Sequence, residues 1–161
     1  MPLLRITLSG PFEVVLDGEP VSGFESNSAR ALLAYLASEP GRARPRPAVA
    51  EMLWPERRNG AALSNLRHAL TSLRHALDQT GDGSRLLIAD RNTIALAGTS
   101  DVWVDIVELG ALAATSPTAD DAAQAWERAV SLWRGPLLED IRVNAGAEWE
   151  EWLLVTSERV R

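Results

Sequence analysis

The first residues of the chain alternate between apolar and polar positions in a way that predicts three short strands. Residues 3–9 (LLRITLS) and 12–16 (FEVVL) each alternate well enough for a strand, and a Gly-Pro pair between them signals a turn. The Asp-Gly pair that follows predicts a hairpin turn into a further short strand at residues 19–21. The chain is therefore expected to begin with a small antiparallel sheet.

Leucines spaced three and four apart predict the first and the third of three helices in the next segment, and Pro47, which suits the first turn of a helix, predicts the second. The first covers residues 29–37, is capped by Asn27 or Ser28, and stops before a Pro-Gly pair. Residues 41–47 (GRARPRP) are predicted to form a loop, because their prolines have no amide donor. The two remaining helices are expected at residues 48–53 and 59–79.

After the third helix, apolar runs at residues 86–89 and 93–96 flank an Asp-Arg-Asn turn and predict a hairpin. A change of composition at residues 98–100 then marks a domain boundary, beyond which the chain becomes acidic and rich in tryptophan. The last predicted helix has no stop signal, so we expect the chain to be a fragment of a longer protein. The helices expected in this part are 103–114, 119–133 and 147–161.

Strands, three helices and a hairpin follow one another in the order of a winged helix-turn-helix with an N-terminal antiparallel sheet. We therefore predict an α+β domain over residues 1–98, followed by an all-α segment over residues 99–161. In a winged helix, the second and third helices form the helix-turn-helix, the third lies in the DNA major groove, and the hairpin is the wing.

The longest predicted helix repeats the five letters LRHAL with a period of seven, as LRHALTSLRHAL. A coiled coil has this period, but it needs about three or four heptads and both charge signs beside its seam. Here there are barely two heptads and almost no acid. The five leucines fall within about 80° of arc and so serve one small core. The polar residues Ser64, His68, Thr71 and His75 lie nearly opposite the leucines, and Arg67 and Arg74 lie beside them.

The charge of the chain is unevenly distributed, and all sixteen basic residues are arginine. Residues 1–26 carry a net charge of −3, residues 27–96 a net charge of +4 and residues 97–161 a net charge of −7. A basic middle between acidic ends indicates an anionic partner for one segment. Arginine binds phosphate and guanine with two hydrogen bonds, and an acid-poor polar helix face donates to phosphates and base edges. The middle segment is therefore the candidate to bind double-stranded DNA.

Six strings, spread in order over nearly the whole chain, carry a resemblance to a known family. They are ARALLAYLA (29–37), MLWP (52–55), NLRHAL (65–70), DVWVD (101–105), WRGPLL (133–138) and EWEEWLL (148–154). These strings resemble the Streptomyces antibiotic regulatory protein family, whose relatives include large bacterial signal-transduction ATPases with the same N-terminus. The resemblance implies a winged-helix DNA-binding domain at residues 1–98. It also implies that residues 99–161 are the opening portion of a longer, tetratricopeptide-like bacterial transcriptional activator domain.

The resemblance implies a cytoplasmic transcriptional activator that recruits RNA polymerase, often from direct repeats in DNA. The acidic helical half would then serve homodimer formation, polymerase contact or coupling to a sensor. One departure matters: relatives often carry Arg-Lys where this chain has Asn27 and Ser28. We expect weaker phosphate contact here, and a shallower dependence of binding on salt.

The predicted DNA-binding residues come from the third helix, its N-terminal approach and the hairpin turn. We expect the helix, at about residues 60–79, to read the major groove, and the hairpin, at about residues 86–96, to contact the backbone or the minor groove. Ser64, Asn65, His68, Thr71 and His75 are expected near bases. Arg57, Arg58, Arg67, Arg74 and Arg91 are expected on phosphates, and Asn59 and Asn92 complete the set.

Two interpretations stay open for the arginines outside this helix. Arg42, Arg44 and Arg46 would either flank the DNA backbone or keep their loop soluble. Arg91 at the hairpin tip would either touch DNA or be an ordinary exposed arginine of a loop.

The sequence lacks the residues expected for metal binding, for catalysis or for a membrane span. With no cysteine, and with His68 and His75 as the two histidines, no metal site is expected. Neither GxxxxGK nor GxSxG occurs, so we expect no enzyme and no cofactor. No apolar run approaches the roughly 20 residues that span a bilayer, so no membrane partner is expected.

A different class of function fits the acidic net charge and the Asn27-Ser28 departure. In this alternative the chain is a protein–protein interaction module, with the winged helix as a scaffold and the helical half docking a partner. The six tryptophans would build cores or a partner surface. We expect Trp149 and Trp152 to face different sides of their helix, which would leave one of them exposed.

Overall fold

The computed structural model describes residues 3–21, 24, 26–55, 59–78, 83–114, 119–141 and 147–159, and it has an α+β fold as predicted. No helix within these ranges has the length and apolar character needed to cross a membrane. The elements, in chain order, are β1 (Leu4–Thr7), β2 (Glu13–Leu16), β3 (Glu19–Pro20), α1 (Asn27–Ser38), β4 (Arg44–Pro45), α2 (Arg46–Leu53), α3 (Asn59–Leu77), the 3-10 turn η2 (Gly83–Leu86), β5 (Leu87–Ala89), β6 (Thr93–Leu96), β7 (Val102–Val104), α4 (Asp105–Ala114), α5 (Ala119–Leu132) and α6 (Ala147–Arg159).

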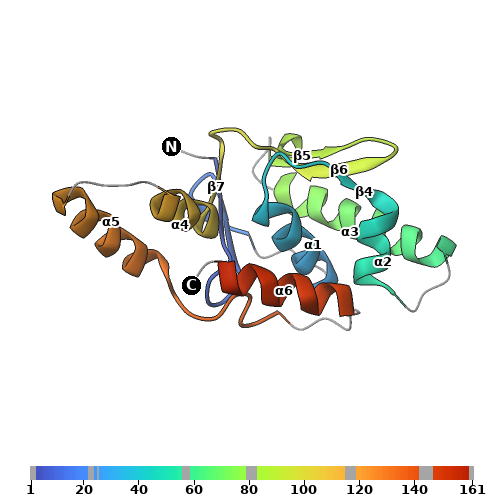
Figure 1. The fold of residues 1–161 in the computed structure, drawn as a ribbon. Helices are drawn as coiled ribbons and strands as arrows, with labels where there is room; N and C mark the ends of the chain where they lie inside the picture. The colour runs from blue at the N-terminus through green and yellow to red at the C-terminus, as the bar shows by residue number, and fades with distance from the viewer. Residues whose placement is uncertain are drawn as a thin grey trace.

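The N-terminal strands form a sheet in the order β3-β2-β1-β7. β1 pairs antiparallel with β2, as predicted, and Ile6 lies opposite Val14. The other edge of β1 pairs in parallel with β7, and the Leu4 amide donates to the Asp101 carbonyl at 2.8 Å. Figure 1 shows this sheet nearly edge-on, between α4 on one side and helices α1 to α3 on the other.

Strand β7 corrects the helix predicted over residues 103–114, and with it the expectation that residues 99–161 are all helical. A Val-Trp-Val run favours a strand where a sheet edge is free, because β-branched and aromatic side chains pack well on a pleated surface. The Arg5 guanidinium on β1 also lies 4.2 Å from the centre of the Trp103 ring, which adds a cation–π contact. The helix therefore begins only at Asp105.

Helices α1, α2 and α3 correspond to the three predicted helices and pack around one core with the sheets. The cap of α1 differs from the prediction, since the Ala29 amide donates to Ser26 Oγ at 3.2 Å rather than to Asn27 or Ser28. Four of the five stripe leucines of α3 are fully buried, which confirms that they serve a core. The largest fully buried side chains are Leu4, Ile6, Leu8, Leu16, Leu32, Leu33, Leu36, Leu66, Leu70, Leu73, Leu77 and Leu86.

The second sheet contains the predicted hairpin of β5 and β6, with β4 added in the order β4-β6-β5. Part of the predicted loop at 41–47 is therefore a short edge strand, in which Arg44 lies opposite Ile94. A proline is tolerated there because an edge strand needs only some of its amides. At the end of the hairpin, a Cβ on Gly98 would lie 2.9 Å from the Gly41 Cα, so only glycine allows the two chain segments to cross.

Helix α6 packs across α1 and α2, as Figure 1 shows. Trp149 is buried, and its ring centre lies 4.8 Å from that of Trp152. Trp152 is half-buried and meets Tyr35 of α1 edge-on at 5.2 Å between ring centres. The expectation that one of these two tryptophans is exposed is therefore wrong. Both rings join the hydrophobic core that α1, α2 and α3 build.

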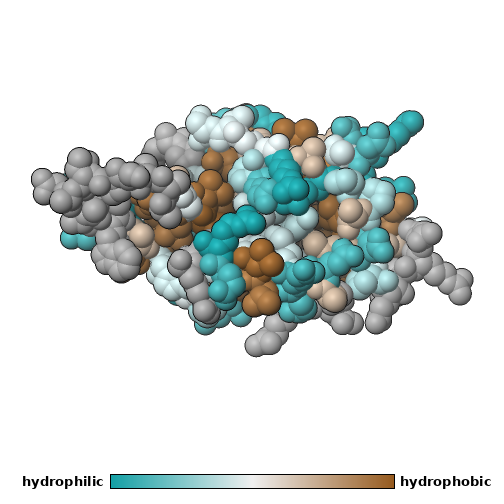
Figure 2. Space-filling model, in the orientation of Figure 1, coloured by the Kyte–Doolittle hydropathy of each residue, from teal (hydrophilic) through white to brown (hydrophobic). Residues whose placement is uncertain are grey.

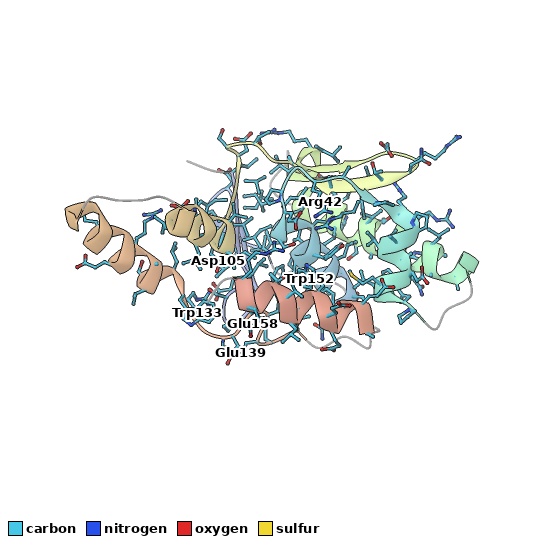
Figure 3. All side chains as sticks on the ribbon, in the orientation of Figure 1. Arg42, Asp105, Trp133, Glu139, Trp152 and Glu158 are labelled. Atoms are coloured by element: carbon cyan, nitrogen blue, oxygen red, sulfur yellow. The ribbon has the colours of Figure 1, made fainter. Side chains whose placement is uncertain are left out.

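One region, which we call the junction, joins the N-terminal sheet to later parts of the chain. It consists of residues 8–13, Arg30, Asp105 and residues 132–140. The Asp105 carboxylate is buried and accepts hydrogen bonds from the amides of Leu8 (2.8 Å) and Ser9 (3.0 Å) and from Ser9 Oγ (2.7 Å). Ser9 also forms an isolated antiparallel bridge with Leu137. Asp105 lies at the start of α4 beside the sheet, as labelled in Figure 3. The junction thus ties the N-terminal sheet to the segment that follows residue 98.

Ion pairs close the same junction on its outer side. Asp140 accepts the Phe12 amide at 2.7 Å and pairs with Arg30 of α1 at 2.8 Å. Partial burial raises the pKa of Asp140, but these hydrogen bonds and the Arg30 charge outweigh it and leave the pKa below its ordinary value. Arg134 binds both carboxylate oxygens of Glu13, at 3.1 and 3.2 Å. Arginines here are therefore committed to carboxylates of the same chain.

Candidate nucleic-acid interface

The long helix α3 presents one wide exposed face opposite its core leucines. Arg67, His68, Thr71, Arg74 and His75 are all exposed, as the angular pattern of the sequence predicted. At 100° per residue they span about 120° of arc, with the two arginines at one edge and His68 at the other. Because α3 has 19 residues, it is about 28 Å long, enough to lie along a DNA major groove.

The other predicted residues of this helix are placed differently. Ser64 is half-buried near the middle of the exposed arc, and Asn65 is half-buried on the side of the buried alanines Ala62 and Ala69. Asn65 is therefore a poorer candidate for base contact than the exposed residues. Asn59 is the first residue of α3, while Arg57 and Arg58 lie outside the described residues.

Thr71 has its hydroxyl engaged within the helix. Its Oγ1 donates to the Arg67 carbonyl one turn earlier, at 3.0 Å. The oxygen still has lone pairs free to accept a hydrogen bond, and the methyl group is available for apolar contact. This side chain can therefore meet either an amino group of a base or a thymine methyl group.

The tip of the β5–β6 hairpin is held by one carboxylate. Asp90 Oδ1 accepts the amides of Asn92 and Thr93, each at 2.7 Å, and Oδ2 accepts the Thr93 hydroxyl at 3.2 Å. The Thr93 and Asn92 amides lower the pKa of Asp90 below its ordinary value, because they bond only the charged form. Arg91 and Asn92, both predicted to touch DNA, are exposed on this fixed turn.

The hairpin tip is also attached to the start of α2. The Arg46 amide donates to the Asn92 carbonyl at 2.9 Å. Figure 1 shows the hairpin tip and the N-terminal part of α3 extending toward the same end of the molecule, with α2 beside them. The pattern of the sequence gave no signal for this attachment, because it joins residues far apart in the chain.

Ion pairing separates the arginines of the chain into two groups. Within the described part of the chain, no carboxylate lies within ion-pair distance of Arg67, Arg74 or Arg91. The arginines that do pair with carboxylates are Arg30, Arg42, Arg44, Arg85, Arg128, Arg134 and Arg159. Arg5, which lies over the Trp103 ring, and Arg46 at the start of α2 also have no ion pair among the described residues. Three of the five unpaired arginines therefore lie on the exposed face of α3 and the hairpin tip.

The structure gives two of the three arginines at residues 42–46 a role within the fold. Arg42 and Arg44 both pair with Glu39, and Arg44 stacks over the Tyr35 ring at 4.5 Å. The hydrogen bond from Arg42 is the main reason that the pKa of Glu39 is lowered. These two arginines hold the turn after α1, and a contact of any of the three with the DNA backbone stays a prediction.

The described residues contain no group of three or more histidine, cysteine or carboxylate side chains arranged to hold a metal ion. The arrangement is instead a convex polar helix face with a basic edge, next to a rigid hairpin tip. Convex elements of this kind fit a groove in a partner, whereas small ligands need a concave site.

Comparisons with known proteins point to one relative. No protein-family model matches the chain. It is similar to "Transcriptional regulatory protein EmbR" of Mycobacterium tuberculosis and of Mycobacterium bovis, each 28% identical over 146 residues. These alignments cover 86% of this chain and 37% of the relative, so the chain spans little more than a third of the length of the curated relatives it matches.

A solved structure of Mycobacterium tuberculosis EmbR, in complex with a low-affinity phosphopeptide, has a similar fold. The superposition gives a TM-score of 0.80 at 25% sequence identity, covering 99% of this chain and 43% of that chain. The likeness includes the segment after residue 98 as well as the three-helix core.

Proposed function

We propose that the chain is a DNA-binding part of a transcriptional regulator that recognises a specific double-stranded sequence. In this proposal residues 1–98 form a winged helix-turn-helix, α3 lies in the major groove, and the β5–β6 hairpin contacts the backbone or the minor groove. The observation that carries the proposal is the set of arginines without carboxylate partners on α3 and the hairpin tip. Similarity to a protein named as a transcriptional regulator supports it.

The position of each side chain on α3 suggests its role. Arg67 and Arg74 lie at the edge of the exposed face, where a helix in the groove passes the phosphate backbone. His68, Thr71 and His75 lie further round the face, where side chains reach base edges. Arg91, on the rigid hairpin turn, is proposed to hold a phosphate or enter the minor groove.

A charge-reversal pair tests this proposal directly. The double variant Arg67→Glu with Arg74→Glu should lose measurable duplex binding, because two phosphate attractions become repulsions on an otherwise unchanged face. Arg128→Glu is the matched control, since Arg128 is an exposed arginine that already pairs with Glu108. The control should bind as the wild type does, and thermal denaturation should show that all three proteins are folded. Duplex binding by the double variant would overturn the proposal.

We further propose that residues 99–161 are the start of an activator domain and that the regulator works as an activator in the cytoplasm. RNA polymerase would be its protein partner, and a homodimer through this segment would match direct repeats in DNA. The junction makes such coupling physically reasonable, because a displacement of α4 would be transmitted to the N-terminal sheet through the Asp105 hydrogen bonds. The resemblance to large signal-transduction ATPases stays a prediction.

A second candidate function is a protein-interaction module that uses the winged helix only as a scaffold. The acidic segment after residue 96 and its exposed apolar side chains favour it. Titration of the whole chain with random duplex at low salt separates the two functions. The whole chain is needed because β7 and α6 complete the sheet and the core of the first 98 residues. Salt-sensitive binding supports the DNA-binding function, and its absence favours the scaffold.

A further inference from the structure

A groove separates α6 from the end of α1 and the start of α4. It has a volume of about 300 Å³. Its apolar walls are Ile106, Trp152 and Val155, and the charged side chains of Glu39, Glu148, Glu151 and Arg159 line it as well. Trp152 lies on the side of α6 that faces α1, as Figure 3 shows. The groove is thus apolar at its walls, and its margin carries three carboxylates and one guanidinium group.

The acidic side chains of the groove are not equivalent. Glu39 is engaged by Arg42, Arg44 and Arg159, whose three positive charges exceed its one negative charge. Glu148 and Glu151 are exposed, and neither side chain has an ion pair or hydrogen bond with any other described residue. These two carboxylates lie one turn apart on α6 and are the unpaired negative charges of the groove lining.

Large apolar side chains continue from the groove onto the exposed face of α6. Val155 is 48% exposed and Leu154 is 63% exposed. Figure 2 shows hydrophobic surface on α6 flanked by hydrophilic surface. An exposed apolar patch bordered by polar residues is typical of a protein interaction site.

We propose that this groove and the adjacent face of α6 bind a segment of a partner protein that carries arginine or lysine beside large apolar side chains, as one face of an amphipathic helix does. The cationic groups would meet Glu148 and Glu151, while the apolar side chains cover Val155, Trp152 and Leu154. A helix that lays its apolar face in a groove is a common mode of peptide recognition. DNA is not the occupant, because the carboxylates would repel its phosphates.

A second copy of this chain fits the groove less well. Its candidate basic surface is the exposed face of α3, whose residues from Arg67 to His75 include no exposed large apolar side chain. That surface could satisfy the charge of the groove but would leave Leu154 and Val155 uncovered. The proposal is therefore independent of DNA binding and concerns a different face of the molecule.

A pair of synthetic peptides tests the chemistry of the proposed partner. The probe is an amphipathic helical peptide of leucine and arginine, and its counterpart has glutamate in place of every arginine. The wild-type chain should bind the arginine peptide at least about tenfold more tightly than the glutamate peptide. The double variant Glu148→Arg with Glu151→Arg should lose this preference. Glu150→Arg is the control on the same helix, since Glu150 is exposed but does not line the groove.

Equal binding of the two peptides, no binding of either, or an unchanged preference in the double variant would each overturn the proposal. Denaturation curves of the variants show whether they are folded; since all three glutamates are exposed, we expect wild-type stability. The variant Arg67→Glu with Arg74→Glu should keep the peptide preference. This last measurement separates failure of the groove proposal from failure of the DNA-binding proposal.

Photo-crosslinking identifies the natural occupant. A benzophenone amino acid at position 155 should crosslink, in cells, to a segment with at least two arginine or lysine residues next to apolar ones. The same group at position 130, exposed on α5 and absent from the groove, is the control. A crosslink to a second copy, to a further segment of the same chain or to a segment without basic residues would contradict the proposal, as would no product above the control.

Discussion

The exposed face of α3 and the junction use the same residue type in opposite ways. At the junction, Arg30 and Arg134 lie within 3.1 Å of carboxylates of the same chain. On α3, the described region offers no carboxylate within ion-pair distance of Arg67 or Arg74. The junction arginines therefore stabilise the fold, whereas the arginines on α3 are available to bind a negatively charged partner.

The difference teaches that the number of arginines is a poor guide to a nucleic-acid interface. The chain has net charge −6, yet among the described residues three of the five arginines without an ion pair lie on one helix face and one hairpin tip. A paired arginine contributes little to the field that a phosphate meets, because its partner carboxylate cancels it at short range. The following predictions test how independent the two regions are.

The largest effect is expected from Asp105→Ala at the junction. The change leaves the Leu8 and Ser9 amides without their buried acceptor, whereas the Ser9 hydroxyl can still donate to the Leu132 carbonyl at 3.0 Å. Each lost amide partner costs roughly 1–3 kcal/mol, so unfolding in urea should show a destabilisation of about 2–6 kcal/mol. Asp101→Ala is the control, because Asp101 pairs with Arg85 at a half-exposed position and should cost no more than about 1 kcal/mol. Similar midpoints for the two variants would mean that the junction is not a stabilising contact.

The elements within each half could be predicted from local pattern. Leucine spacing predicted α1 and α3, a proline suited to the first helical turn predicted α2, and alternation with turn residues predicted β1, β2 and the β5–β6 hairpin. β7 could not be predicted this way, because three residues form a strand only when the edge of β1 is free beside them. Asp105 and Asp140 had no local signal either, since their partners lie about a hundred residues away in the chain.

The candidate site was predictable to the extent that it lies on one helix. The angular count placed His68, Thr71 and His75 on an exposed face, and they are exposed. It could not separate Arg42, which pairs with Glu39, from Arg67, which has no such partner among the described residues. Glu39 and Arg42 are only three residues apart, but a count of angles around a helix does not describe the turn after α1 that brings the two side chains together.

The second prediction compares the histidines on the exposed face of α3 with the arginine at its edge. His68→Ala or His75→Ala should change the preference for one base pair by about 1–3 kcal/mol in competition binding, because each side chain is proposed to touch a base edge. Arg67→Ala should instead weaken binding to all sequences alike and reduce the salt slope by about 1. If Arg67→Ala changed sequence preference while the histidine variants did not, the proposed division of roles along the face would be reversed.

The third prediction concerns the response of the junction to acid. The pKa of Asp140 is lowered below its ordinary value of 3.8, so its stabilising effect is present above that value and is lost as pH falls through the folded-state pKa. Asp140→Asn should therefore be less stable than the wild type at pH 7 and equally stable at pH 2. Because the Asp140 side chain is 38% exposed, solvent screening limits the difference at pH 7 to about 1 kcal/mol. Denaturation at the two pH values measures it, and Glu150→Gln, at an exposed position outside the junction, should show no such difference.

The smallest effect is expected where the two regions are least connected, at the hairpin tip. Asp90→Ala removes the acceptor that fixes the Asn92 and Thr93 amides, so Arg91 loses its preorganised position. Duplex affinity should fall a few-fold while the stability of the junction, measured by hydrogen exchange at the Leu8 and Ser9 amides, stays unchanged. The conservative variant Asp90→Asn keeps a side-chain oxygen for these amides and should recover most of the affinity. If Asp90→Ala instead increased exchange at Leu8 and Ser9, the hairpin and the junction would be one cooperative unit rather than two surfaces with separate tasks.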